Sequence, residues 1–279
     1  MKKLFLFVIT SVLLCGCKPH GMPVPDQKYD DYGAFLGRSD NDVTGFSNYK
    51  YVSVELDEFG DSNIERLSSK GVNFLAYLNI GSLETYRDYY DDYERLTFKD
   101  YENWPDERWI DVSNSDWQDF VVNTLAKGFK DRNAYGVYLD NVDVYSIAKE
   151  EGLNYSAYAA GIKNILKGVT DLGLFVMING GAEFLEDIKD DEDDAVGLIW
   201  AYHQEEVFSL IKDYENNTFG EQNTEDRKYY QEISSLMKDM GKEVFYLEYT
   251  TDESLQKTIK EYCDSKEYHY YFASDVDLK

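Results

Sequence analysis

The sequence predicts a single α/β domain, a (β/α)8 or TIM barrel. Its 279 residues suit one such barrel, for which roughly 250 residues are typical. From residue 33 to the end, apolar runs of strand length alternate with segments of helical period, as expected for parallel strands joined by helices. Three of these runs lead into acidic residues, and the carboxyl ends of parallel strands are where such folds carry their chemistry.

Eight apolar runs predict the strands, and amphipathic runs between them predict helices. In one of these runs Trp117, Val121, Leu125 and Phe129 recur every four residues and form one core-facing stripe. The predicted strands are 33–36, 51–56, 73–79, 135–140, 174–179, 198–202, 244–249 and 270–273. The predicted helices include 62–70, 116–129, 155–170, 226–240 and 254–264.

A long aromatic-rich segment, about residues 81–115, follows the third strand and is predicted to be a loop. Loops at the carboxyl end of a barrel build its active site. The aromatic side chains could stack on sugar rings or only pack the loop against the barrel, and the sequence favours neither. These residues are Tyr86, Tyr89, Tyr90, Tyr93, Tyr101, Trp104 and Trp109.

Residues 1–17 are predicted to be a lipoprotein-type signal peptide. A basic start precedes an apolar run of about eleven residues, which is too short to span a bilayer. The segment resembles a bacterial lipoprotein signal, which is cut before a cysteine that then carries the lipid, here Cys17. An ordinary secretory signal is the alternative. Residues 18–31 read as a flexible tether and residues 32–279 as the barrel domain, so we expect an extracytoplasmic protein that meets the bacterial cell membrane only through Cys17.

The net charge of −26 excludes binding of a nucleic-acid backbone as the main activity, because that binding depends on Lys and Arg. An acidic surface favours cationic ligands, or serves only solubility. No phosphate-binding loop, dinucleotide fingerprint, serine elbow or zinc-protease motif is present. Only His203 and His269 lie in the expected domain, so we expect no cofactor and no metal, although an oxygen-ligated calcium stays open. No pattern argues for an oligomer, and we expect a monomer.

Acidic residues end or follow three of the predicted strands. The predicted strand 135–140 carries Asp140 at its end, with Asp143 three residues later. The strands 198–202 and 244–249 lead to Glu205 and Glu248. Any single one of these acids could merely cap the next helix. Carboxylates and aromatic residues at the carboxyl ends of barrel strands are typical of enzymes that cleave glycosidic bonds. In these enzymes one acid protonates the leaving oxygen, and another attacks or activates water. Of two such carboxylates held close together, one is expected to have a raised pKa.

Six sequence blocks resemble glycoside hydrolase family 114, the endo-α-1,4-polygalactosaminidase-like TIM barrels, over nearly all of the chain after the signal. The blocks are 77–87, 109–112, 136–143, 177–181, 204–208 and 247–249. The resemblance implies a hydrolase of an α-linked amino-sugar polysaccharide in which Asp140 and Glu205 are the catalytic carboxylates. It further implies a sugar cleft lined by Asn79, Glu84, Arg87, Asp143, Asn179 and Glu248, together with Glu55, Tyr77 and Tyr202. One departure is Glu55, where the family usually has Asp.

Several of these residues have other readings. Glu84 and Arg87, three apart, could be a helix-surface ion pair, and Asn179 before two glycines could simply form a turn. Glu206 is the chief rival of Glu205, because a one-residue shift at the strand end exchanges which acid faces the cleft. A non-catalytic surface lipoprotein that binds carbohydrate, or a hydrolase of another sugar polymer, would carry the same residues.

Overall fold

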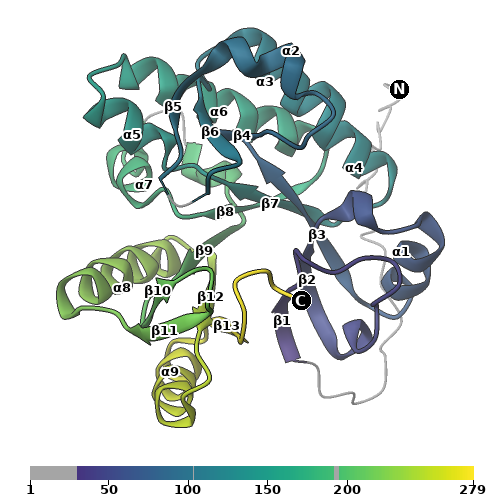
Figure 1. Ribbon diagram of the computed structural model, residues 1–279, viewed down its shortest axis with the longest axis vertical. Coiled ribbons are helices and arrows are strands. Elements are labelled where there is room, and N and C mark those ends of the chain that lie inside the picture. The colour runs from purple at the N-terminus through teal and green to yellow at the C-terminus, as the bar shows by residue number, and fades with distance from the viewer. Residues whose placement is uncertain (1–29, 103, 192–194) are drawn as a thin grey trace, which may run out of the picture.

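Eight parallel strands form the centre of the molecule (Figure 1). The computed structural model describes residues 30–102, 104–191 and 195–279. The strands follow the order β1-β2-β3-β7-β8-β9-β12-β13, and β13 returns beside β1, so that the sheet nearly closes into a barrel. This confirms the predicted (β/α)8 fold. The barrel strands are β1 (Asp30–Ala34), β2 (Tyr49–Val54), β3 (Asn73–Asn79), β7 (Gly136–Asp140), β8 (Phe175–Asn179), β9 (Ala201–Glu205), β12 (Glu243–Tyr249) and β13 (His269–Ala273).

Helices cover the outside of the barrel, and side-chain caps begin four of them. Asn114, Asn223 and Asp252 each accept two hydrogen bonds, and Asn154 accepts one, from backbone N–H groups in the first turn of the helix that follows. The helices are α1 (Asp61–Ser68), α2 (Tyr90–Tyr93), α3 (Ser115–Phe120), α4 (Lys127–Asp131), α5 (Val144–Glu150), α6 (Tyr155–Asp171), α7 (Ala182–Ile188), α8 (Thr224–Asp239) and α9 (Glu253–Lys266). A π-helical segment, Val121–Ala126, joins α3 to α4, and single 3-10 turns lie at Phe46–Asn48, Leu56–Glu58, Glu94–Leu96 and Ala195–Leu198.

Alternation along the strands divides the core into two layers. Val137 and Leu139 of β7 pack outward against the helices, whereas Tyr138 points into the barrel. The interior is filled mostly by aromatic and aliphatic side chains, among them Tyr32 and Phe245. Because side chains alternate, Asp140 at the end of β7 emerges on the interior side with Tyr138.

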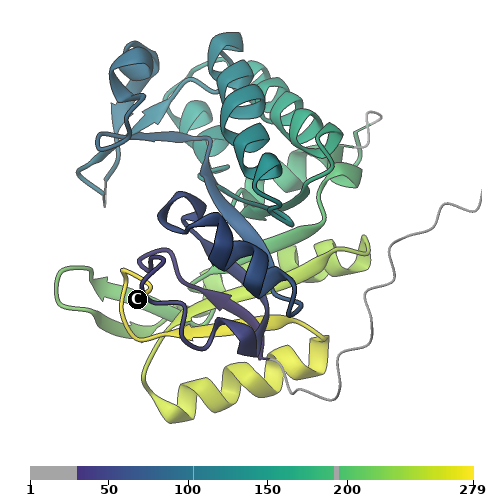
Figure 2. The same ribbon diagram turned by 90° about the vertical axis from the view of Figure 1, so that its right-hand side faces the viewer.

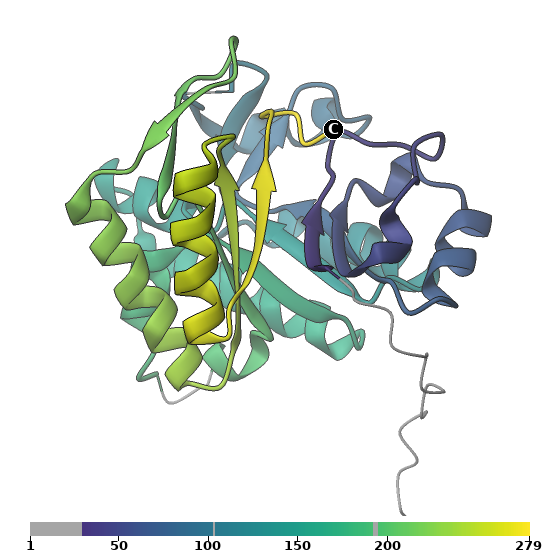
Figure 3. The same cartoon turned by 90° about the horizontal axis from the view of Figure 1, so that it is seen from below.

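Two additions extend the barrel at the carboxyl ends of its strands. The segment after β3 was expected to be a plain loop, and this expectation is wrong. The segment contains a three-stranded antiparallel sheet of β4 (Ser82–Glu84), β6 (Glu107–Ile110) and β5 (Thr97–Asp100). A hairpin of β10 (Ser209–Asp213) and β11 (Thr218–Glu221) follows β9. Figure 2 shows both additions on the same side of the molecule as the last residues of the chain. In Figure 3 the arrows of β12 and β13 point toward the end that carries the hairpin.

Most predicted elements are found within two residues of their expected bounds, with two kinds of difference. The strand expected at 198–202 lies at Ala201–Glu205, because a 3-10 turn occupies the residues up to Leu198. Helices α2, α5 and α7 were not predicted. The first strand begins at Asp30, within the expected tether, while Cys17 and the expected signal lie outside the described residues. Within the described ranges, no helix combines the length and apolar character needed to cross a membrane.

Candidate active site

A cleft of about 790 Å³ opens at the carboxyl ends of the strands, where the three-stranded sheet, the β10–β11 hairpin and the last residues of the chain meet. Its size is that of a ligand-binding site. The residues expected in the sugar cleft that do line it are Glu55, Tyr77, Asp140, Asp143, Asn179 and Glu205.

Asp140 and Glu205 lie at the floor of this cleft, on either side of Asn179. These residues end β7, β9 and β8, so neighbouring parallel strands deliver all three side chains to one place. The Asn179 Nδ2 group donates to Asp140 Oδ1 at 2.9 Å and to Glu205 Oε1 at 2.8 Å. Since both oxygens bond to one nitrogen, they cannot be farther apart than the sum of these distances, 5.7 Å.

Tyrosine hydroxyls bind the outer oxygens of both carboxylates. Tyr77 donates to Asp140 Oδ2 at 2.8 Å, and Tyr249 donates to Glu205 Oε2 at 2.7 Å. A third phenol, that of Tyr138, donates to Glu205 Oε1 at 3.1 Å. Burial and nearby carboxylates raise the phenol pKa values far above the usual range, so the hydroxyls remain donors. Burial, and then the charge of Glu205, raises the pKa of Asp140 to about 6, although the bonds from Asn179 and Tyr77 act against this.

Asp143 also lines the cleft, and a pair of glycines makes room for it. Its carboxylate accepts the backbone N–H of Gly181 at 3.0 Å, and burial raises its pKa to about 6. Gly180 has φ +66°, in the left-handed region, and a Cβ there would collide with the Asp143 carboxylate. The turn after Asn179 is therefore real, but Asn179 itself takes part in the site as well.

The Glu84–Arg87 pair is not on a helix surface. Glu84 ends β4 and is 1% exposed, and Arg87 Nη2 donates to Glu84 Oε1 at 2.9 Å and to Glu55 Oε1 at 2.6 Å. Of the three, only Glu55 belongs to the cleft wall. Burial raises the pKa of Glu55, while hydrogen bonds from Arg87 act against it. Glu84 and Arg87 thus support the wall from behind.

Glu107 is a cleft carboxyl group that the sequence did not reveal. It begins β6 of the three-stranded sheet and accepts hydrogen bonds from Ser82 Oγ and, at 3.5 Å, from Asn79 Nδ2. Burial raises its pKa to about 7. Asn79 was expected to line the cleft but lies just behind the cleft wall. Its Nδ2 group donates both to Glu107 and to the Tyr77 hydroxyl. The composition of residues 81–115 resembles that of a loop and does not indicate that Glu107 faces the cleft.

Two expected cleft residues point away from it. Glu248 is fully buried on the outer side of β12, where it accepts hydrogen bonds from the backbone of Phe208 and Ser209 and from Ser209 Oγ. Burial raises its pKa to about 7. Tyr202 lies on the outer side of β9, and its hydroxyl bonds to the Gln204 side chain. Their expected place in the cleft is wrong, because both stand one residue out of phase with the interior positions.

Glu206, the rival of Glu205, follows the end of β9 with φ +56°. It lines the cleft, but its carboxylate accepts the backbone N–H of Ile211 at the start of the hairpin. Burial raises its pKa to about 7. Of the two acids, Glu205 is the one bonded to Asn179 and hence paired with Asp140.

The aromatic residues of the insertion lie in two kinds of place, some at the cleft wall and others packed within the protein. Tyr86, Tyr101 and Trp104 line the cleft. Tyr89 and Tyr93 instead pack on Trp117 and Phe120, and Trp109 is buried in the core with its ring stacked on Tyr101.

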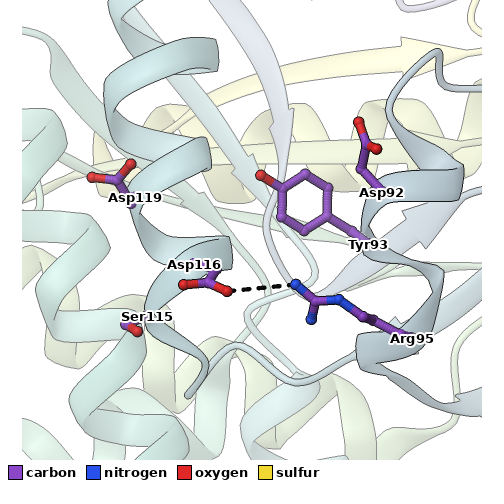
Figure 4. Close-up of a pocket in the computed structure, with 6 residues that line it drawn as sticks. All are labelled: Asp92, Tyr93, Arg95, Ser115, Asp116 and Asp119. Atoms are coloured by element: carbon purple, nitrogen blue, oxygen red, sulfur yellow. Dashed lines mark hydrogen bonds and ion pairs between the residues drawn. The ribbon is translucent and has the colours of Figure 1, made fainter.

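A second hollow lies between the α2 region and α3, away from the cleft (Figure 4). Asp92, Asp116 and Asp119 surround it, and Arg95 spans it to reach Asp116 at 3.4 Å. These acids are exposed, so this hollow has none of the buried, hydrogen-bonded carboxylates of the cleft. Across residues 30–102, 104–191 and 195–279, no group of three or more His, Cys, Asp or Glu side chains could hold a metal ion.

Comparison with known proteins identifies the family. The glycoside hydrolase domain of PelA from Pseudomonas aeruginosa has a similar structure, with TM-score 0.74 and 16% identity over 89% of this chain and 95% of that domain. Aspergillus fumigatus Ega3, solved with galactosamine, gives TM-score 0.70 and 16% identity over 91% and 94% of the two chains. At these identities the likeness shows the fold alone.

Among curated sequences, an uncharacterized protein of Methanocaldococcus jannaschii is 25% identical over 250 residues, which cover 78% of this chain and 65% of that protein. An uncharacterized Thermotoga maritima protein is 26% identical over 111 residues, 38% of this chain and 34% of that one. This chain thus spans less than two thirds of either relative. The sequence model of glycoside-hydrolase family GH114 matches residues 25–273, and because this match spans most of the chain, the protein belongs to that family.

Proposed function

We propose that this protein is a retaining glycoside hydrolase that cuts an α-linked polymer of amino sugars, such as galactosamine, within the chain. The main support is the separation of Asp140 and Glu205, at most 5.7 Å between their nearest oxygens, on the floor of an open cleft. Retaining glycosidases hold their two carboxyl groups about 5 to 5.5 Å apart, whereas inverting enzymes need roughly 6.5 to 9.5 Å to admit a water molecule.

In this mechanism one carboxyl group gives its proton to the glycosidic oxygen while the other, ionised, attacks the anomeric carbon from the opposite face. The bond to the leaving oxygen breaks, and a glycosyl ester forms on the enzyme. The first carboxylate then takes a proton from water, and the water oxygen displaces the ester and restores the original configuration. Tyr77 and Tyr249 stabilise the ionised states of Asp140 and Glu205 by hydrogen bonding.

The charge of the cleft supports a cationic substrate. Among its described lining residues, Lys279 is the one basic side chain, and it pairs with Asp277. The protonated amine of an unacetylated amino sugar would be attracted to such a wall, while Tyr86, Tyr101 and Trp104 offer apolar ring faces. The related Ega3 was solved with galactosamine. The lining carboxyl groups are Glu55, Asp106, Glu107, Asp140, Asp143, Glu205, Glu206 and Asp277.

We also propose that the protein acts outside the cytoplasm, anchored to the membrane by a lipid on Cys17. The basic and apolar start of the sequence supports this. Growing the producing bacterium with a labelled fatty acid should label the wild-type protein and leave Cys17→Ala unlabelled, and labelling of both proteins would contradict the anchor.

The enzymatic proposal is tested with protein produced without residues 1–17 and with deacetylated α-1,4-galactosamine oligomers. We expect release of reducing ends, and a loss of about 10³-fold or more in Asp140→Asn and Glu205→Gln. Asp119→Asn, the same change in the exposed hollow of Figure 4, should keep full activity. Undiminished cleavage by Asp140→Asn would refute the assignment. Binding without cleavage by the wild type would favour the carbohydrate-binding alternative, and cleavage of other glycans only would change the substrate.

A further inference from the structure

His203 lies beneath the carboxylate pair, inside the barrel. It belongs to β9, two residues before Glu205, and is completely buried. Its ring meets Tyr32 and Tyr138 edge-on, with centroids 5.6 and 4.9 Å away. The Nδ1 atom is 2.7 Å from Asn179 Oδ1 and 3.2 Å from the Tyr138 hydroxyl. The Nε2 atom has no hydrogen-bond partner among the described residues.

These contacts fix which nitrogen carries the proton. Both hydrogens of the Asn179 Nδ2 group are used by Asp140 and Glu205, so Asn179 Oδ1 must face His203 as an acceptor. His203 must therefore donate from Nδ1. The same N–H faces the Tyr138 oxygen, whose own hydrogen points to Glu205. One buried donor thus directs an amide and a phenol toward the two carboxylates.

The ring is also held neutral. Burial lowers the pKa of His203 to about 3. The titratable groups around it are the phenols of Tyr32 and Tyr138, with the Glu205 carboxylate beyond Tyr138. The hydrogen bond to Asn179 therefore stays the same while the catalytic carboxyl groups change their protonation.

Accepting the proposed function, we propose that His203 is a positioning residue: its Nδ1–H orients the Asn179 amide and the Tyr138 hydroxyl so that they hold Asp140 and Glu205 ready for reaction. Without this donor only the bonds to Asp140 and Glu205 hold the Asn179 amide, and its plane can tilt away from the orientation that those bonds need. The attacking and proton-donating groups would lose their alignment, an error that costs about 10²-fold in rate even when it is small.

The first test does not need a substrate. The purified protein is labelled with ¹⁵N at its histidines, of which the chain has three, and followed by NMR from pH 5 to 8. Signals are assigned with His269→Gln, at the other end of the barrel, and with His203→Asn. We expect the His203 ring to be neutral, with hydrogen on Nδ1, at every pH. Hydrogen on Nε2, or titration near pH 6.5, would overturn the inference even if the protein cleaves no galactosamine.

The second test is kinetic and uses oligomers that the wild type cleaves. His203→Leu should lower kcat by about 10²-fold with KM within about threefold, while His203→Asn, which keeps an N–H near the same place, should recover at least about tenfold. The limb of the kcat/KM pH profile that reports Asp140 should move to higher pH in His203→Leu, because the hydrogen bond from Asn179 lowers the pKa of Asp140 and is weakened in this variant.

A double-mutant cycle separates positioning from a general structural role. In an Asn179→Ala background, His203→Leu should cost no more than about fivefold, since the amide that it orients is gone and Tyr138 alone remains. A full 10²-fold loss in that background would show that His203 acts independently of Asn179 and would overturn the inference. His269→Gln should leave kcat unchanged. If His203→Leu does not fold, His203→Asn and the NMR experiment still decide.

Discussion

Replacing Tyr77 by phenylalanine removes one hydrogen bond from Asp140 and changes little else. The Tyr77 hydroxyl donates to Asp140 Oδ2 at 2.8 Å, and the residue is 9% exposed, so the phenylalanine ring fills nearly the same volume. Asn79 loses a 3.3 Å bond to the same hydroxyl but keeps its bond to Ser82. The substitution therefore tests one donor to one carboxylate.

The expected size follows from the charge on Asp140. A hydrogen bond to a charged group contributes about 1.5 to 3 kcal/mol, and each pKa unit corresponds to about 1.4 kcal/mol. Tyr77 bonds to the ionised form, so its removal raises the pKa of Asp140 by about 1 to 2 units. The starting value is about 6. In Tyr77→Phe we therefore expect it at about 7 to 8.

The assay is the pH dependence of kcat/KM on galactosamine oligomers, which reports ionisations of the free enzyme. If ionised Asp140 attacks the sugar, the rising limb moves up, and kcat/KM at pH 6 falls by about 5- to 50-fold but recovers as the pH rises above 8. If protonated Asp140 donates instead, the falling limb moves up. Tyr214→Phe, in the same cleft wall, should move neither. Limbs of Tyr77→Phe that stay within about 0.3 units of the wild type would refute the reasoning.

Three further predictions concern stereochemistry and stability. Proton NMR of the first product should show the α-anomer of the new reducing end, and initial β-anomer would exclude a retaining mechanism. Glu107, Asp140, Asp143, Glu206 and Glu248 have pKa values raised to about 6 to 7, so the folded chain keeps protons that the unfolded chain loses. The contribution of these protonated groups to the stability of the fold is present in full below about pH 4.5 and is lost as the pH rises through 6 to 7. Urea unfolding should therefore show lower stability at pH 8 than at pH 5, and the opposite trend would contradict these pKa values. Arg87→Met leaves the Glu84 charge buried and should lower the free energy of unfolding by about 3 kcal/mol. Arg95→Met breaks only an exposed ion pair and should change the free energy of unfolding by less than about 1 kcal/mol. Equal losses in the two variants would show that burial of Glu84 is not the cause.

The barrel and the central pair could be predicted from the sequence because their signals repeat. Apolar runs eight times over define the strands, and strand-end positions brought Asp140, Asn179 and Glu205 together as expected. The residues that face the cleft were harder to predict. In a parallel barrel both faces of a strand are buried, so hydrophobicity does not tell the interior positions from the outer ones. The pattern therefore could not correct the expectation, implied by the family resemblance, that Tyr202 and Glu248 line the cleft.

Other parts of the site depend on contacts that sequence patterns do not report. Glu107 reaches the cleft only because residues 82–110 fold into an antiparallel sheet, whose pairing of β4 with β6 sets its position. The role of Arg87 depends on Glu55, 32 residues earlier, which sequence spacing does not connect to it. Sequence patterns likewise do not report the bond between His203 and Asn179 on the adjacent strand, on which the proposed role of His203 depends.

The position of the last residues bears on how the protein should be handled. Val276, Asp277, Leu278 and Lys279 belong to the cleft wall, and Leu278 accepts a backbone hydrogen bond from Gly37 beside β1. An affinity tag or fluorescent label fused after Lys279 would therefore sit at the mouth of the cleft and obstruct a long polysaccharide more than a short oligomer. Purification and labelling should use another site on the protein, and any enzyme tagged at this end should be assayed on both chain lengths.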